Sequence, residues 1–171
     1  MFVFPLACVC ALSSLVAAPL PTAPMAGCLR PPVVAPVVDP FRQPACPWCA
    51  GNRGLEYDVA AGTEVRAAAA GTVTFAGSVA GVRYVVVEHA DGLRATYGRL
   101  DSATVATGRR VATGQIVGRS GDGLFFGIRR GETYLDPAPL LGRLVERARL
   151  VPTDGSRPRR PPPAVLACAA G

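Results

Sequence analysis

Among the residues of this 171-residue sequence that could do chemistry, the segment Cys46-Pro47-Trp48-Cys49 has two cysteines separated by two residues. In thiol–disulfide oxidoreductases, the first cysteine of such a pair begins a helix, and its thiolate is stabilised there. The same spacing forms half of many zinc sites. Here the next residues, 50–54, have the composition of a loop, and no second pair with this spacing exists. We therefore predict a structural disulfide between Cys46 and Cys49, with redox activity and metal binding as alternatives.

Other common chemistries lack their residues. All 18 basic residues are arginine, so a lysine Schiff base, a P-loop lysine and a lipoyl or biotinyl lysine are excluded. No Gly-x-Ser-x-Gly motif supports a serine nucleophile. The single histidine, His89, lies at the end of a predicted strand. One histidine without a companion cannot build a histidine-rich hydrolytic zinc site, and we expect it to bond to the backbone.

The charge pattern favours acidic partners over nucleic acid. The formal net charge is +6, and the arginines are scattered without interleaved aromatic residues. This balance favours acidic wall polymers or anionic surfaces by Coulomb attraction. The clearest pairs are Arg109 with Arg110 and Arg129 with Arg130. They are interpreted as solvated strand ends, with contact to an acidic polymer or partner as the functional alternative.

Short strands separated by glycines must position these residues. The sequence contains 19 glycines and only 6% aromatic residues, which is typical of short strands and tight turns. Only residues 140–150 have a helical pattern, and residues 151–171 are rich in proline and arginine. Strands are predicted at 63–67, 71–75, 83–88, 95–99, 115–117 and 124–129. The predicted core residues are Val73, Phe75, Val85, Val87, Ile116 and Phe126.

The order of several short motifs resembles one enzyme family, the lysostaphin or LytM-type zinc metallopeptidases with a duplicated hybrid motif. The resemblance covers roughly residues 33–142. It implies an all-β fold, a small antiparallel β-sandwich or barrel-like domain, here with a short C-terminal helix and a disordered tail. The motifs are Arg53-Gly54-Leu55, Ala61-Gly62-Thr63, Ala68-Ala69-Ala70-Gly71-Thr72-Val73, Val86-Val87-Glu88-His89, Asp91-Gly92-Leu93, Thr96-Tyr97-Gly98-Arg99-Leu100, Gly114-Gln115-Ile116-Val117-Gly118, Phe126-Gly127-Ile128-Arg129-Arg130-Gly131 and Asp136-Pro137.

In active members of that family, His-x-x-x-Asp and the second histidine of His-x-His hold a zinc ion that activates water. The positions that match these ligands are Asn52, Glu56 and Phe125. The positions that match the two assisting histidines are Gly123 and Arg99, and arginine is a permanent cation that would repel a zinc ion. A catalytic zinc site needs three protein ligands, and only Glu56 remains. The resemblance therefore predicts a degenerate member with no bound metal and no cofactor.

The residues around the lost metal position are still candidates for binding a substrate. The predicted substrate-binding set is Asn52, Glu56, Tyr97, Arg99 and Phe125, and Tyr57 is a further candidate to line the groove. Phe125 and Phe126 must point to opposite faces because they are adjacent on one strand. By the match, Phe125 faces the former metal position and Phe126 faces the core.

The N-terminus indicates export. Residues 1–29 carry no charged side chain, and residues 6–18 form an apolar run of the length of a signal-peptide core. We divide the chain into a signal peptide or membrane or lipid anchor (1–28), a proline-rich lead-in (29–45), a LytM-like domain (46–150) and a disordered tail (151–171). Lipidation would use Cys28, which follows Met25-Ala26-Gly27.

These observations predict a bacterial protein that is secreted or lies in the cell envelope. They favour a pseudo-peptidase over an active enzyme. Such a protein would bind peptidoglycan or regulate another cell-wall hydrolase, with no nucleic acid as partner. Two alternatives remain open. One is a residual zinc endopeptidase that uses Glu56, and the other is an envelope thiol–disulfide protein that uses Cys46 and Cys49.

Overall fold

The structure of the protein is a computed structural model, which describes residues 28–46, 48–146 and 163–168. Residues 1–27 of the predicted signal or anchor, and residues 151–162 of the predicted tail, lie outside the described residues. Among the described residues, no helix is long and apolar enough to cross a membrane. The predicted all-β fold class is confirmed, because strands make up nearly all of the regular structure.

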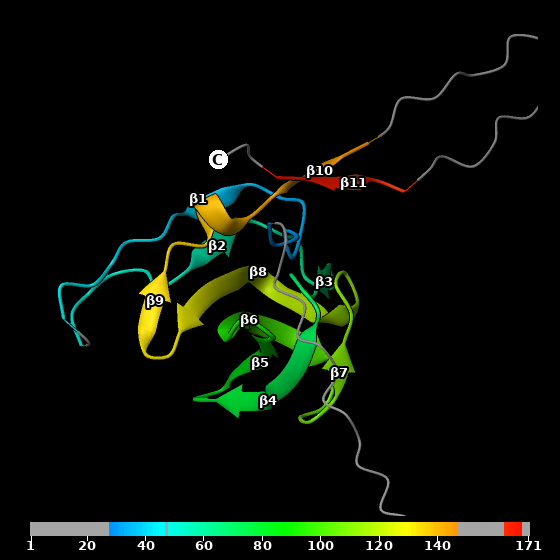
Figure 1. Cartoon of the computed structure of the whole chain (residues 1–171). Helices are drawn as coiled ribbons and strands as arrows, with labels where there is room; N and C mark the ends of the chain where they lie inside the picture. The colour runs from blue at the N-terminus through cyan, green and yellow to red at the C-terminus, as the bar shows by residue number, and fades with distance from the viewer. Residues whose placement is uncertain (1–27, 47, 147–162, 169–171) are drawn as a thin grey trace, which may run out of the picture.

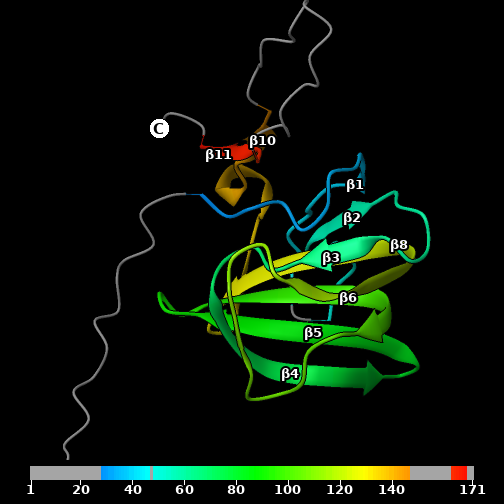
Figure 2. The same ribbon diagram turned by 90° about the vertical axis from the view of Figure 1, so that its right-hand side faces the viewer.

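The strands are short at both ends of the chain and long in the middle. β4, β5, β6 and β8 are the long strands of the sheet and lie side by side, as Figures 1 and 2 show. The elements are β1 (Val37–Asp39), β2 (Leu55–Tyr57), β3 (Glu64–Arg66), β4 (Gly71–Val79), β5 (Val82–His89), β6 (Leu93–Ala103), β7 (Arg110–Val111), β8 (Ile116–Arg130), β9 (Thr133–Leu135), the 3-10 helix η1 (Ala138–Leu140), β10 (Arg143–Val145) and β11 (Val165–Ala167).

One antiparallel sheet of nine strands carries the fold, with the order β1-β2-β8-β6-β5-β4-β7. β3 and β9 pair with the same side of β8 as β2 does, at the two ends of that strand. The hairpin between β4 and β5 closes through Ala80 and Gly81, whose φ angles are 50° and 81°. Two consecutive positive φ angles are those of a type I′ turn, whose twist suits a two-residue hairpin.

The core lies on one face of this sheet, and the predicted core is mostly confirmed. Val73, Val85, Val87 and Phe126 are buried. Phe75 is 37% exposed, and the prediction that it fills the core is wrong. A β-bulge explains the error: Val73 pairs with Val87, but Phe75 pairs with Val86, so Thr74 is an extra residue. One extra residue turns every following side chain of the strand to the other face.

Ile116, also predicted for the core, is only half-buried. It begins β8 and pairs with Arg66 at a point where the register between β3 and β8 shifts. Its neighbour Val117 is fully buried instead. The alternation along β8 therefore starts one residue later than predicted.

The C-terminal part differs from its prediction. The helix expected over residues 140–150 is not found in the described part of that range, residues 140–146, because η1 ends at Leu140 and β10 follows; residues 147–150 lie outside the described residues. Gly142 packs so closely against the Cys28 sulfur that no Cβ atom fits there. Within the predicted tail 151–171, β11 pairs with β10, and Cys168 forms a disulfide with Cys28. These long-range contacts hold the segment extended.

The lead-in segment also belongs to the fold. Leu29 and Val33 are buried, and β1 pairs with β2 at the edge of the sheet. Leu29 donates to the carbonyl of Leu140 and accepts from Gly142, which joins the start and the end of the described chain.

Candidate functional site

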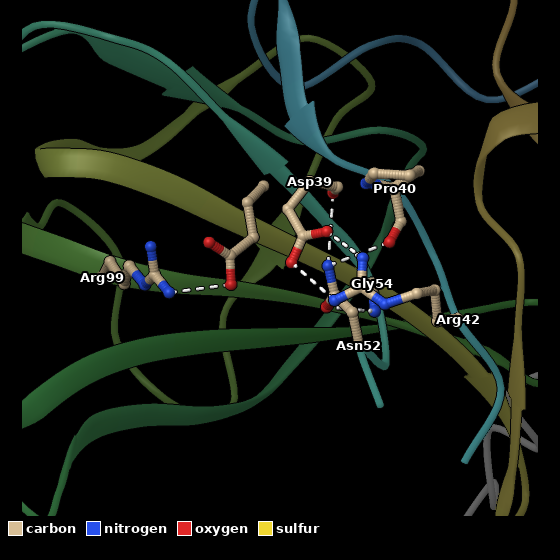
Figure 3. Close-up of polar contacts among 7 residues, drawn as sticks. Asp39, Pro40, Arg42, Asn52, Gly54 and Arg99 are labelled. Atoms are coloured by element: carbon tan, nitrogen blue, oxygen red, sulfur yellow. Dashed lines mark hydrogen bonds and ion pairs between the residues drawn. The ribbon is translucent and has the colours of Figure 1, made fainter. Parts of the chain in front are cut away.

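The sequence-predicted site residues come together where β2 lies beside β8. Glu56 on β2 pairs in register with Phe125 on β8, and Phe125 pairs on its other side with Gly98 on β6. Asn52 precedes β2, and Arg99 follows Gly98 on β6. Figure 3 shows Arg99 on one side of this place and Asn52, with Asp39 and Arg42, on the other. The register therefore brings four predicted site residues to one place on the sheet.

Asn52 acts as a clasp between backbone segments. Its side chain is buried, with 6% of the residue exposed. The amide nitrogen donates to the carbonyls of Asp39 and Pro40, at 3.2 Å each, and the amide oxygen accepts from the backbone N–H of Gly54 at 3.2 Å. Both donors and the acceptor are therefore in use, and the side chain holds the turn before β2 against the end of β1.

An ion pair that the sequence analysis missed lies beside this clasp. The Arg42 guanidinium donates to both carboxylate oxygens of Asp39, with an Nη2–Oδ2 distance of 3.0 Å. This bond is the main reason why the pKa of Asp39 lies below its ordinary value. The backbones of Arg42 and Asn52 also exchange two hydrogen bonds. The i,i+3 spacing of Asp39 and Arg42 was the only signal for this pair in the sequence.

A second ion pair joins Glu56 to Arg99. The Nη2 atom of Arg99 lies 2.7 Å from Oε1 of Glu56. The φ angle of Arg99 is 59°, which a residue with a side chain adopts only when its surroundings require it. A Cβ atom at Gly123 would lie 4.0 Å from Nη1 of Arg99. The guanidinium therefore stands beside Glu56 and Gly123, which are both predicted site positions.

The Phe125 ring rests on glycines. Cβ atoms at Gly54, Gly98 and Gly127 would lie 2.8, 3.2 and 3.1 Å from its ring carbons. Phe126 is fully buried, so the predicted opposite orientation of the two rings is found. The Phe125 ring thus forms an apolar floor of the site, and side chains at Gly54, Gly98 or Gly127 would collide with it.

Tyr97 lies elsewhere than predicted. It is fully buried, its hydroxyl accepts the backbone N–H of Ala68 at 2.7 Å, and its ring packs 5.4 Å from that of Phe126. Tyr57 is also buried, and burial raises its pKa to about 12. Both lie on the core face because strand alternation places them opposite Thr96 and Glu56. The structure therefore removes Tyr97 and Tyr57 from the surface of the groove.

Two tyrosines that the sequence did not indicate as site residues, Tyr84 and Tyr134, take part in the groove. Phe125 shares a hollow of about 210 Å³ with Arg53, Tyr84, Thr96, Arg129 and Tyr134. Arg53 lies over the ring of Tyr134 at 5.6 Å. Tyr84 and Tyr134 come from β5 and β9, which are far apart in sequence, so no local pattern could connect them.

The cysteine pair and the single histidine, which the sequence also indicated, have structural contacts. Cys46 and Cys49 form a disulfide, as predicted, and Trp48 between them is 86% exposed. Residues 50–54 after this loop contain no helix that would stabilise a thiolate. His89 is buried, and its Nδ1 atom lies 3.0 Å from the carbonyl of Ala70, in agreement with a structural role.

The residues present do not fit the zinc ion of the active enzymes. Asn52 uses its amide for backbone contacts, and Glu56 is paired with a guanidinium. Phe125 has no donor atom. Within the part of the chain that the structure describes, no group of three or more His, Cys, Asp or Glu side chains is arranged to hold a metal. The arrangement offers hydrogen bonds, charge and an apolar surface for binding a ligand.

Comparisons with known proteins identify relatives of this chain. The sequence profile described as Peptidase family M23 matches residues 50–137, about half of the chain. The murein hydrolase activator EnvC of Escherichia coli is 40% identical over 99 residues, which cover 53% of this chain and 24% of EnvC. An uncharacterized protein of Mycobacterium tuberculosis is 31% identical over 140 residues, which cover 74% of this chain and 55% of that protein.

Solved structures share the fold of this chain. Csd3 of Helicobacter pylori superimposes with a TM-score of 0.60 at 26% identity, over 67% of this chain and 35% of Csd3. The catalytic domain of lysostaphin from Staphylococcus simulans gives a TM-score of 0.55 at 22% identity, over 61% of this chain and 90% of that domain. The chain spans only 24% and 55% of the length of the two curated relatives named above.

Proposed function

Because this chain belongs to peptidase family M23, we propose that it is a non-catalytic member that regulates a bacterial cell-wall hydrolase. One observation carries the proposal: the positions that match the metal ligands are committed to other contacts or lack a donor. Asn52 clasps backbone, Glu56 pairs with Arg99, and Phe125 rests on glycines. A metal ion at this place would meet a permanent cation and at most one free ligand.

The proposed activity is binding through the groove beside this site. The hollow has an apolar floor at Phe125, aromatic walls at Tyr84 and Tyr134, and the positive charge of Arg129. A groove of this kind suits a peptide that offers apolar groups and a carboxylate. A wall hydrolase supplies such a surface, and a peptidoglycan stem peptide is the second partner to test. The similarity to a protein described as a murein hydrolase activator supports the first partner.

We place the protein outside the bacterial cytoplasm, secreted or in the cell envelope. Two disulfides, Cys28–Cys168 and Cys46–Cys49, are typical of an oxidising compartment. The first of them uses the Cys28 thiol that a lipid anchor would need. Cleavage of a signal peptide without lipidation is therefore the proposed route of export.

The proposal is tested with the full mature chain and dye-labelled peptidoglycan. Alone, the protein should release no dye, with or without added zinc. Together with a purified peptidoglycan amidase or endopeptidase, it should raise the rate of dye release. Dye release by the protein alone that a chelator abolishes would instead establish the residual endopeptidase, and a reactive Cys46 thiol with no effect on the hydrolase would favour the thiol protein.

A pair of charge variants assigns the effect to the groove. Arg129→Glu reverses the charge in the hollow, and Arg143→Glu makes the same change on β10, outside it. We expect Arg129→Glu to lose the stimulation and Arg143→Glu to keep it. Equal loss in both variants would mean that overall charge acts and that the groove does not.

A further inference from the structure

The sheet has a second edge, formed by β4 and β7, on the side away from β2. β4 is nine residues long, but its outer partner β7 pairs only with Gly71 and Thr72. Beyond Val73, which bonds to Gly108 and Arg109, no described strand pairs with this side of β4. Figure 2 shows β4 as the outermost long strand of the sheet. Residues 75–79 therefore present an open sheet edge.

The open edge lacks most of the usual protection against pairing. Proteins blunt such edges with charged residues, proline or very short strands. β4, with the sequence GTVTFAGSV, contains no charged residue and no proline, and its single bulge lies at Thr74 before the open part. An exposed, uncharged edge of this length is suited to accept another strand.

The backbone geometry shows which groups point outward. The hairpin closes with Val79 paired to Val82. In a two-residue hairpin the closing pair exchanges hydrogen bonds, and alternate residues face away from the partner strand. The N–H and C=O groups of Ser78 and Ala76 are therefore directed to the open side, where an added strand would find them.

An apolar hollow lies next to this edge. The bulge turns Phe75 to the open face of the sheet, where it is 37% exposed, and Val79 on the same side is 56% exposed. Together with Tyr84 and Val86 they line a hollow of about 460 Å³. Strand-addition sites combine an open edge, which provides affinity, with a pocket that selects alternate side chains. Both features are present here.

Charge decides between the possible occupants. Arg109 and Arg110 are exposed where the open part of β4 begins, and Arg83 lies opposite Ser78 near its other end. None of these three forms an ion pair with another described residue. Two copies that paired their β4 strands antiparallel would bring Arg110 of each towards Arg83 of the other, and like charges would oppose them. An acidic partner gains from the same charges.

We infer that the open edge of β4 binds an extended, acidic polypeptide segment as an added strand, with an apolar side chain in the hollow beside Phe75. Carboxylates of the segment lie near Arg109 and Arg110. This inference goes beyond the regulation of a hydrolase through the groove. The two hollows share Tyr84, Thr96 and Arg129, but the edge residues Ser78, Arg109 and Arg110 do not line the groove. Variants at these three edge residues therefore test strand addition without changing a residue that lines the groove.

A short synthetic peptide tests the inference directly. The probe alternates glutamate with valine or phenylalanine and carries a fluorophore, and its affinity for the full chain is measured by anisotropy. A control peptide with lysine in place of glutamate should bind at least about tenfold more weakly, since tenfold corresponds to about 1.4 kcal/mol. Equal binding of the two peptides would overturn the acidic specificity.

Two substitutions at one position separate strand addition from general charge attraction. Ser78→Pro removes an outward N–H group, and proline is tolerated at such an edge position. Ser78→Ala keeps the N–H group. We expect the affinity to fall about fivefold to tenfold in Ser78→Pro, the equivalent of one lost hydrogen bond, and to stay unchanged in Ser78→Ala. Circular dichroism and the melting temperature check that both variants are folded.

Further outcomes also decide the question. With Arg109→Glu/Arg110→Glu, the preference should move towards the lysine peptide. Binding that depends on these arginines but is identical in Ser78→Pro and Ser78→Ala would show a charged surface without strand addition. A stable dimer of the free protein that Ser78→Pro dissociates would identify a second copy as the occupant. Either result would overturn the inference.

Discussion

Asn52→Asp gives the sharpest test of how this site differs from a metal centre. The substitution keeps the shape of the side chain but replaces the amide nitrogen, which donates two bonds of 3.2 Å to Asp39 and Pro40, by an oxygen that cannot donate. The bond from the Gly54 N–H is kept. If Asn52 is a clasp, the protein loses stability; if it is a free side chain at a ligand position, stability hardly changes.

The size of the effect follows from the bonds lost. Each contributes a net ~0.5–1.5 kcal/mol, so the free energy of unfolding should fall by about 1–3 kcal/mol. The introduced carboxylate would also face two carbonyl oxygens, which raises its pKa in the folded state. A folded pKa above the unfolded value means that the deficit is smallest at low pH and grows as the pH rises through that range.

Urea unfolding followed by circular dichroism at pH 7 and at pH 4.5 measures both effects. Gln43→Glu makes the same amide-to-carboxylate change at an exposed position nearby and serves as the matched control. The difference between Asn52→Asp and the parent should be larger at pH 7 than at pH 4.5, and Gln43→Glu should show almost no difference. An Asn52→Asp protein as stable as the Gln43→Glu protein at pH 7 would refute the clasp.

Three further predictions concern the core and the termini. Tyr97→Phe leaves the buried N–H of Ala68 without its acceptor, so urea unfolding should show a loss of about 1–3 kcal/mol, and a loss under 0.5 kcal/mol would contradict the bond. Burial lowers the pKa of His89 in the folded protein, so the unfolded chain binds the proton at a higher pH. The free energy of unfolding should therefore fall as the pH drops below about 6.5, by at most ~1.4 kcal/mol per pH unit. His89→Gln should reduce this slope, and an unchanged slope would exclude His89 as its source. Cys168→Ser opens the disulfide to Cys28 and should lower the free energy of unfolding by about 2–5 kcal/mol without reductant, whereas equal stability would show that the terminal link is dispensable.

The local sequence predicted the fold class because strands and glycine turns leave a clear pattern. The paired strands β4 and β5, the burial of Val85 and Val87, and the opposite orientation of Phe125 and Phe126 all follow from period-two alternation. The prediction failed at Phe75, where one bulge residue reverses the alternation, since no local signal marks a bulge at Thr74.

The site was predicted in part from the order of the short motifs. Motif order located Asn52, Glu56, Arg99 and Phe125, and register then brought them together. The motif Tyr97-Gly98-Arg99-Leu100 made Tyr97 a groove candidate, because motif order does not specify the face of β6 to which a side chain points. Only the tertiary structure shows that its hydroxyl accepts a hydrogen bond from the backbone N–H of Ala68 inside the core.

By itself, the sequence determined the chemistry that is missing: no lysine, one histidine, and Asn52 and Phe125 where the family's ligands match. These are properties of residue type and spacing, which need no coordinates. Tertiary structure decided what replaces that chemistry, namely an amide clasp, the Glu56–Arg99 ion pair and a terminal disulfide. Each joins segments that are far apart in the chain, and such contacts depend on strand register and loop packing, which a linear pattern does not specify.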